Sequence, residues 1–400
     1  MLADNKTELY TFEEQLNIFH IAESSSVHLS DILRDAKLSY NDLVYYNSYS
    51  KNYKKVRPLG LSDFCAPSRS IPVVSFFSGC GGLDLGLEAA GFSHLACVEI
   101  NETFCKTIRR NRPTWTVFGP PVHSGDVSEV DKIIPSLEAM ITSPFEGLFV
   151  GGPPCQPFSI AANQRFAKSG DKFKRIGFAH EKNGNLLFDF ISLIKHFRPL
   201  AFLIENVPGL RDIDKGVQIK EAISELTANG YSVQEPFTID ASNYGVPQQR
   251  IRLFIVGSRR EKSFVLPTPQ DGLTGCGNVL CDKSLDNLAN TEIRQHNTTS
   301  VSRYCMLDYG QRDQLGRVDR LDPSLPSKTV IAGGTNGGGR SHLHPEIPRT
   351  LSVRESARLQ TFPDDFIFLG PTARQFTQVG NAVPPVLAAQ ISNAILKSFF

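Results

Sequence analysis

The stretch Val73-Val-Ser-Phe-Phe77-Ser-Gly-Cys-Gly-Gly82 joins an apolar, β-branched run to a loop of glycines. The apolar run predicts a buried strand. The residues that follow, Leu83 to Gly91, predict a helix that ends at a glycine. Glycines in such a turn let the backbone approach a ligand closely. This order of strand, glycine loop and helix predicts an α/β fold with a nucleotide-type binding site at the turn.

A second apolar run, Leu95 to Val98, ends at Glu99. Glu99 follows Gly79 by about 20 residues, the spacing at which dinucleotide-binding folds place an acid that binds ribose hydroxyls. Asp126 ends another segment and is a candidate third ligand, although a surface-loop acid is an equally good interpretation. We therefore expect Glu99 and the glycine loop to hold a cofactor.

The segment Gly151-Gly-Pro-Pro-Cys155-Gln-Pro-Phe-Ser159 follows the apolar run Leu148 to Val150. Two glycines and two prolines predict a rigid turn at the end of a strand. A thiol there would be held at a fixed distance from a ligand at the sheet edge. We predict that Cys155 is a nucleophile; the alternative is a tight loop with an inert cysteine.

Five apolar residues, Leu200 to Ile204, precede Glu205. Burial beside such a run would raise the pKa of the carboxyl toward neutrality, which suits a general acid. A carboxylate that caps the next turn is the alternative. Because Glu99, Cys155 and Glu205 all follow predicted strands, they should converge on one edge of a parallel sheet.

Basic residues form two further candidate sites. Arg250 and Arg252 would project from the same face of a strand, which suits a phosphate or an extruded base; a solvated edge strand is the alternative. The loop from Gln164 to Lys182 is strongly basic and follows Cys155, so it could be a lid that meets phosphates rather than a solvated face. Its cations are Arg165, Lys168, Lys172, Lys174, Arg175 and Lys182.

Composition limits the class of protein. The chain has 400 residues, 40% hydrophobic and 21% charged, as in ordinary soluble globular proteins of two or three domains. A formal net charge of +1 means that any nucleic-acid surface must be a local patch. Eight cysteines without CxxC pairs argue against a zinc site or a disulfide scaffold. With neither a signal pattern nor a membrane-spanning run, we expect a cytoplasmic protein with reduced thiols.

The two flanking regions differ from the α/β segment. Residues 1–70 predict a helical extension whose helices start near Thr11, Ser30 and Ser39; it is either a helix-turn-helix or three helices packed on a neighbour. Residues 258–348 are irregular and loop-rich. Ser352 to Glu355 is a capping box, and a last helix is expected from Val386 to Ser398.

Six segments together resemble the cytosine-5 DNA methyltransferase family, of the prokaryotic modification-enzyme type. The resemblance covers residues 72–257 and 325–395. The segments are Phe76-Phe-Ser-Gly-Cys-Gly-Gly82, Gly151-Gly-Pro-Pro-Cys-Gln-Pro-Phe-Ser159, Glu205-Asn-Val207, Gln248-Gln-Arg-Ile-Arg252, Arg354-Glu-Ser-Ala-Arg-Leu-Gln-Thr-Phe-Pro-Asp-Asp-Phe366 and Gln378-Val-Gly-Asn-Ala-Val-Pro-Pro385.

The resemblance implies a Rossmann-like S-adenosylmethionine-dependent methyltransferase domain, formed by residues 71–257 and 376–400. The last helix would return to pack beside the first helix of that domain. A smaller loop-rich target-recognition domain would occupy residues 258–375, and the helical extension, residues 1–70, lies outside the resemblance.

The resemblance also assigns residues. Cys155 would be the nucleophile and Glu205 the acid, while Arg250 and Arg252 would support the target cytosine. The S-adenosylmethionine site would comprise Phe77, Ser78, Gly79, Cys80, Gly81, Gly82, Glu99, Ile100, Asp126, Val127, Pro153, Leu186, Asn381, Ala382 and Val383. Contacts to DNA would come from Gln156, Ser159, Arg165, Lys172, Lys174, Arg175, Thr329, Gly333 and Gly334, with Thr329 beside the flipped-out base. No metal is expected.

By this resemblance the protein is a monomeric enzyme that methylates cytosine in a short site of double-stranded DNA through a covalent Cys155–C6 adduct. A restriction endonuclease would act on the same site without physical contact. RNA (tRNA) cytosine methylation is the alternative within the family, and the absence of a Cys-Phe-Thr signature favours DNA. A nicotinamide-dependent dehydrogenase would leave Cys155, Glu205 and the arginine pair unexplained. Intact Cys155 and Glu205 argue against a non-catalytic DNA-binding protein.

Overall fold

A computed structural model describes residues 11–25, 27–47, 52–154, 186–212, 216–281, 284–332 and 341–400. Cys155, the basic loop that follows it, and the pair Gly333 and Gly334 lie outside these ranges. The chain divides into two compact units. The sheet unit combines Leu59–Gly272 with Ala382–Phe400, and the second unit combines Met1–Pro58 with Leu273–Asn381.

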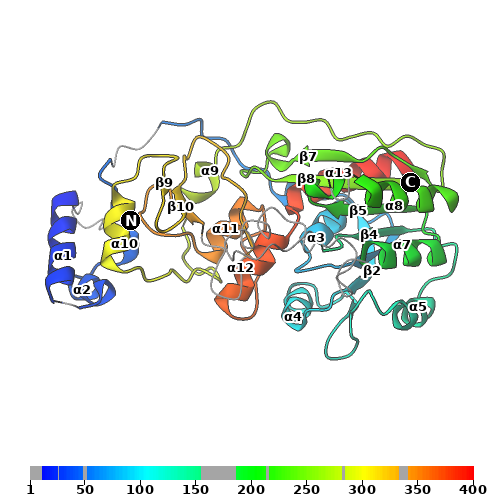
Figure 1. Cartoon of the computed structure of the whole chain (residues 1–400), viewed down its shortest axis with the longest axis horizontal. Coiled ribbons are helices and arrows are strands. Elements are labelled where there is room, and N and C mark those ends of the chain that lie inside the picture. Colours follow the sequence, from blue (N-terminus) through cyan, green and yellow to red (C-terminus); the bar gives the residue numbers. More distant parts are fainter. Residues whose placement is uncertain are drawn as a thin grey trace. The chain divides into compact units, whose positions relative to one another are not determined.

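The sheet unit is built on eight strands in the order β3-β2-β1-β4-β5-β8-β6, with β7 also paired to β8 (Figure 1). Strands β1 to β5 are parallel, whereas β8 runs antiparallel to β5, β6 and β7. The strands are β1 (Ile71–Phe76), β2 (Phe92–Val98), β3 (Val117–Phe118), β4 (Leu148–Gly151), β5 (Ala201–Asn206), β6 (Ser232–Val233), β7 (Phe237–Asp240) and β8 (Ile251–Ser258).

Helices cover both faces of this sheet, which explains why its central strands are almost continuously apolar. Alternate residues of β1 face opposite cores: Val74 packs with α5, α7 and α8, whereas Val73 packs with α3 and α13. The helices of this unit are α3 (Gly82–Ala89), α4 (Glu102–Asn111), α5 (Val130–Glu138), α7 (Leu186–Phe197), α8 (Val217–Ala228) and α13 (Pro385–Phe399), with short 3-10 turns η2 (Leu61–Asp63), η3 (Pro208–Arg211) and η5 (Ala241–Tyr244).

The contact between α3 and α13 is very close. A Cβ added at Gly86 of α3 would lie 2.5 Å from the backbone nitrogen of Ala389 and 2.6 Å from the carbonyl carbon of Ala388, both in α13. Only a glycine permits this approach. The last helix of the chain therefore packs beside the first helix after the glycine loop, as the resemblance implied.

The second unit has little regular structure between Leu273 and residue 348 in its described ranges, in agreement with the irregular composition of residues 258–348. Its three-stranded sheet has the order β11-β10-β9. Its elements are α1 (Phe12–Ser25), α2 (Leu29–Asp35), η1 (Tyr40–Asp42), α9 (Gly277–Leu280), α10 (Thr298–Cys305), β9 (Arg312–Asp313), β10 (Val318–Arg320), β11 (His342–Leu343), α11 (Val353–Leu359) and α12 (Thr372–Asn381).

The N-terminal segment shares a core with the second unit. Phe19 of α1 and Leu33 of α2 pack with Val301 of α10, and the Tyr40 hydroxyl donates a hydrogen bond of 2.6 Å to the carbonyl of His296. From the sequence, we expected residues 1–70 to be a helical extension. Their contacts with residues near 300 could not be recognised, because residues so far apart along the chain leave no local signal. The division into functional domains stays a prediction.

Local helix signals were only partly right in this segment. The capping box at Thr11 is confirmed by its reciprocal bonds with Glu14. Helix α2, however, begins at Leu29 with His28 as its cap, and not at Ser30. Ser39 starts only a 3-10 turn. In the described ranges, no helix combines the length and the apolar character that crossing a membrane requires.

Candidate active site

Four neighbouring strands end at one edge of the sheet. Phe76 at the end of β1 pairs with both Val98 of β2 and Gly151 of β4, and Gly151 pairs with Ile204 of β5. The glycine loop, Glu99, the turn after Gly151, and Glu205 therefore emerge along this edge. Chain order reverses between β1 and β4, and open α/β sheets bind ligands at such a point.

The glycine loop leaves room for a ligand. Gly79 has φ +58° and Gly81 has φ +90°, a backbone conformation that favours glycine. A Cβ added at Gly79 would meet no described atom within 4 Å, so the space above this residue is open. The loop is thus shaped for a close approach between backbone and ligand.

Glu99 is buried and fixes the loop to β2. Its Oε2 accepts a hydrogen bond of 2.7 Å from the Gly79 amide, and its Oε1 accepts one of 2.7 Å from the Asn101 amide. Burial raises the pKa of this carboxyl to about 7, although both amides act in the opposite direction. A carboxylate offers about four lone-pair sites, so Glu99 could still accept a hydrogen bond from a ribose hydroxyl.

The other predicted cofactor residues of the sheet unit differ in exposure. Ile100 is 57% exposed beside Glu99 and offers an apolar surface there that could cover a ligand ring. Asp126 accepts bonds from the Ser128 amide and hydroxyl, as in the surface-loop interpretation. Phe77 and Ala382 are partly exposed, and buried positions are held by Ser78, Cys80, Val127, Pro153, Leu186 and Val383.

Glu205 pairs with an arginine at the same edge. Arg252 Nε lies 2.9 Å from Glu205 Oε1, and the two side chains are only 14% and 13% exposed. Arg250 is almost completely buried. Burial raises the pKa of Glu205, and the positive charges of Arg252 and Arg250 partly counteract this. The desolvation that the sequence predicted for this carboxyl is thus present.

The antiparallel direction of β8 brings the arginines to this edge. Leu253, near the start of β8, pairs with Asn206 at the end of β5. Arg252 therefore lies beside the carboxyl end of β5. Sequence reasoning placed both arginines on one face but could not show that their strand runs opposite to the others.

Glu205 also lies against the turn that leads to Cys155. A Cβ added at Gly152 would lie 2.9 Å from Glu205 Oε2. The Asn206 amide group donates a hydrogen bond of 3.2 Å to the Pro153 carbonyl. Asn206 thus positions this turn, a role that the sequence did not assign although the residue belongs to the quoted Glu205-Asn-Val207 segment.

Two predicted residues lie in the second unit. Thr329 is exposed between the buried Ser327 and Val330, and Asn381 is exposed at the end of α12. A Cβ added at Gly380 would clash with the backbone of Ala332. The segment that carries Thr329 therefore runs close against the end of α12.

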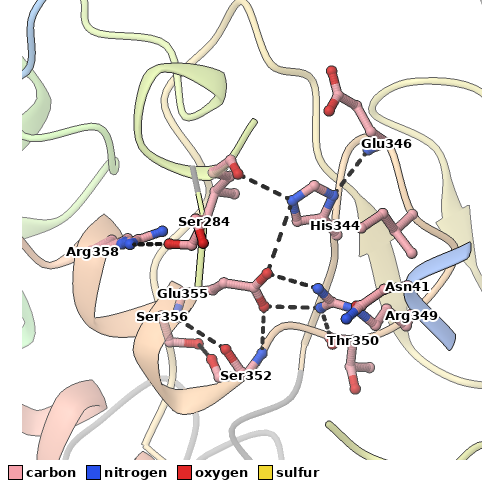
Figure 2. Close-up of polar contacts among 12 residues, drawn as sticks. Asn41, Ser284, His344, Glu346, Arg349, Thr350, Ser352, Glu355, Ser356 and Arg358 are labelled. Carbon is pink, nitrogen blue, oxygen red and sulfur yellow. Dashed lines mark hydrogen bonds and ion pairs between the residues drawn. The ribbon is translucent and has the colours of Figure 1, made fainter. Parts of the chain in front are cut away.

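A buried ion pair holds the segment around α11 in the second unit (Figure 2). Arg349 donates two hydrogen bonds of 2.9 Å, one to each carboxylate oxygen of Glu355, and the Ser352 amide donates a third of 2.7 Å. Arg349 Nε also donates to Asn41 Oδ1 at 2.8 Å. Burial acts to raise the pKa of Glu355, but Arg349 outweighs it and holds the pKa at about 2.

A family model of C-5 cytosine-specific DNA methylases matches residues 71–397. The chain belongs to this family. The Type II methyltransferase M.PspPI of Psychrobacter sp. is 31% identical over 83% of this chain and 80% of its own length. M.Eco47II of Escherichia coli is 30% identical over 81% of this chain and 78% of its own.

Solved structures agree with the fold of this C-5 cytosine-specific DNA methylase. An E. coli protein described as a prophage-encoded DNA modification methyltransferase has a TM-score of 0.66 at 26% identity, covering 82% of this chain and 99% of its own. The resemblance noted from six segments is therefore confirmed, as is the Rossmann-like methyltransferase fold. The protein is a DNA cytosine-5 methyltransferase.

Proposed function

We propose that this methylase transfers a methyl group from S-adenosylmethionine to C5 of a cytosine extruded from a short duplex site, with Cys155 as the nucleophile. The observation that carries the proposal is the Glu205–Arg252 pair, packed against the turn that leads to Cys155. The same sheet edge carries the glycine loop and Glu99, so both substrates would meet there.

The proposed reaction explains why Cys155, Glu205 and Arg252 would be needed together. Cytosine C5 becomes nucleophilic when a thiolate adds to C6, and charge then develops on the ring. Glu205, desolvated and oriented by Arg252, would support N3 by a proton or a hydrogen bond. After methylation, a base removes the C5 proton and the C6–sulfur bond breaks, which restores both the aromatic ring and the Cys155 thiolate.

The residues at the glycine loop fit S-adenosylmethionine. The open space over Gly79 admits a ligand, and the fixed Glu99 carboxylate suits ribose hydroxyls. The exposed Ile100 offers an apolar surface to an adenine ring. When bound, the cofactor supplies an electrophilic methyl group; the residues named here bind and orient it.

The partner would be double-stranded DNA, and the base must leave the stack because C5 cannot be reached within a duplex. Thr329 would contact the extruded base, with Gln156, Ser159 and the cations from Arg165 to Arg175 on the DNA backbone. We further propose a monomeric, cytoplasmic enzyme whose site is shared with a restriction endonuclease, the context in which Type II modification enzymes such as the matched relatives are named.

The test compares Cys155→Ser with Cys65→Ser, which changes an exposed cysteine of the sheet unit. Bisulfite sequencing of DNA from cells that express each variant should show methylated sites for Cys65→Ser and none for Cys155→Ser. A duplex with 5-fluorocytosine at the methylated position should form a covalent complex only when Cys155 is present. Methylation by Cys155→Ser would refute the assignment.

A further inference from the structure

We infer that Asp84, His94 and Cys97 form a zinc-binding site inside the sheet unit. Asp84 lies in the first turn of α3, whereas His94 and Cys97 lie on β2. Each offers one ligand atom, and these three atoms lie within 4.8 Å of one another. The absence of CxxC pairs argued against a zinc site, because these three residues show none of the familiar metal-ligand spacings.

The distances between the ligand atoms suit tetrahedral zinc. Asp84 Oδ1 lies 3.1 Å from His94 Nε2 and 3.8 Å from Cys97 Sγ. Zinc bonds of about 2.0–2.1 Å to nitrogen, 2.0–2.2 Å to oxygen and 2.3 Å to sulfur give tetrahedral edges of about 3.4 Å and 3.6 Å. These two separations differ from the corresponding edges by only a few tenths of an ångström, and the ligand atoms of His94 and Cys97 lie within 4.8 Å of each other.

The charge and the burial of the three side chains also favour a bound Zn²⁺ ion. The side chains of Asp84 and His94 are 0% and 1% exposed, and Cys97 is fully buried. A carboxylate and a thiolate together neutralise the charge of Zn²⁺, while a neutral imidazole completes the set. A buried carboxylate without such a counter-charge is costly.

Two buried polar atoms of the cluster have no partner among the described residues. They are Asp84 Oδ2 and His94 Nδ1. Neither is one of the ligand atoms compared above, which are Asp84 Oδ1 and His94 Nε2. A buried polar atom without a partner calls for an explanation, and an ordered water molecule or an ion is one such explanation. Zinc held by three side chains keeps its fourth position for a water molecule, and Asp84 Oδ2 could accept a hydrogen bond from that water.

The surroundings fix the ligands in place. The His94 ring stacks on Trp115, with the ring centroids 3.9 Å apart and the planes 17° from parallel. The main alternative is a metal-free core cluster, in which His94 and the Cys97 thiol donate hydrogen bonds to Asp84. Zinc would join the helix after the glycine loop to the strand before Glu99, and so stabilise both.

The test begins with zinc content. The full-length protein, purified without chelator, should contain about one zinc ion per chain by mass spectrometry of the metals. Cys97→Ala and His94→Gln should lose it. Cys105→Ala is the matched control, because Cys105 is a buried thiol of the same small core but is not one of the three ligands; this variant should keep its zinc.

A spectroscopic measurement on the wild-type protein provides a test that does not depend on whether the variants fold. After zinc is removed, Co²⁺ bound to the wild-type protein should show a thiolate-to-cobalt absorption band. A chelator should also lower the Tm of the wild type but not that of Cys97→Ala. The inference is overturned if the wild type binds neither ion, or if Cys97→Ala and His94→Gln retain zinc as the wild type does.

Discussion

The ion pair between Arg349 and Glu355 offers a sharp test of what holds the second unit together. Glu355→Gln keeps the shape of the side chain but removes its charge. Arg349 would then stay buried without its counter-ion, and the bidentate contact would lose one of its two acceptors. Because the NH2 of the glutamine amide cannot accept a hydrogen bond from the guanidinium, the variant should be strongly destabilised.

Two independent arguments give the expected loss in the free energy of unfolding of the Glu355→Gln variant. Breaking a buried ion pair by removing one partner costs about 3–5 kcal/mol. The pKa of Glu355 falls from 4.5 to about 2 in the folded protein. At about 1.4 kcal/mol per pKa unit, this difference corresponds to about 3 kcal/mol of stability at neutral pH. We therefore expect the free energy of unfolding to fall by about 3–5 kcal/mol.

Urea unfolding at pH 7, followed by far-ultraviolet circular dichroism, measures this loss. Trp115 is the one tryptophan of the chain and lies in the sheet unit. Its fluorescence therefore follows the unfolding of the sheet unit separately from that of the second unit. The matched control is Asp364→Asn, which breaks the pair between Asp364 and Arg358, a residue of the same helix α11. Arg358 also binds its carboxylate through two bonds of 2.9 Å, but the Asp364 side chain is 45% exposed. A pair with one solvent-exposed partner should contribute less, about 1 kcal/mol. Equal effects of the two substitutions would refute the argument from burial.

Two further predictions concern the stability of the protein at acidic pH and its affinity for the cofactor. Burial lowers the pKa values of His342 and His344 to about 4. The unfolded chain therefore binds more protons than the folded one between pH 6.5 and 4, and stability should fall as the pH drops through this window, by about 1.4 kcal/mol per pH unit for each histidine. The raised pKa of Glu99 acts in the opposite direction over this window, so the test compares the wild type with His344→Gln. Equal changes of the urea midpoint between pH 7 and pH 5 in the two proteins would contradict the prediction. Glu99→Gln should weaken S-adenosylmethionine binding by about 1.5–3 kcal/mol, the value of a charge-assisted hydrogen bond; unchanged affinity by calorimetry would move the cofactor site elsewhere.

Local signals in the sequence predicted the elements of the sheet edge well. The apolar runs before Glu99, Gly151 and Glu205 are strands, and the capping box at Ser352 starts α11. Such features depend on a few neighbouring residues, which is why they can be recognised without the fold.

Features that depend on distant contacts were mostly not predicted from the residues alone. The direction of β8, which brings Arg252 to Glu205, depends on which strand it pairs with. The Asp84, His94 and Cys97 cluster forms only when α3 packs on β2. For the first helices, packing on a neighbour was one of the two alternatives, and their shared core with α10 agrees with it. The partner could not be named from the sequence, because this core joins residues about 290 positions apart, as in the bond from Gln15 to Cys305.

The close contact between α3 and α13 has a consequence for synthesis on the ribosome. Gly86 and its partners on α13 are separated by some three hundred residues, which include most of the second unit. Part of one face of the sheet stays uncovered until α13 has emerged, although α3 already packs on that face. Because domains usually fold as units from the N-terminus during synthesis, this sheet unit should complete its core only once α13 has left the ribosome. Its exposed apolar surface should make chaperone demand highest just before that point.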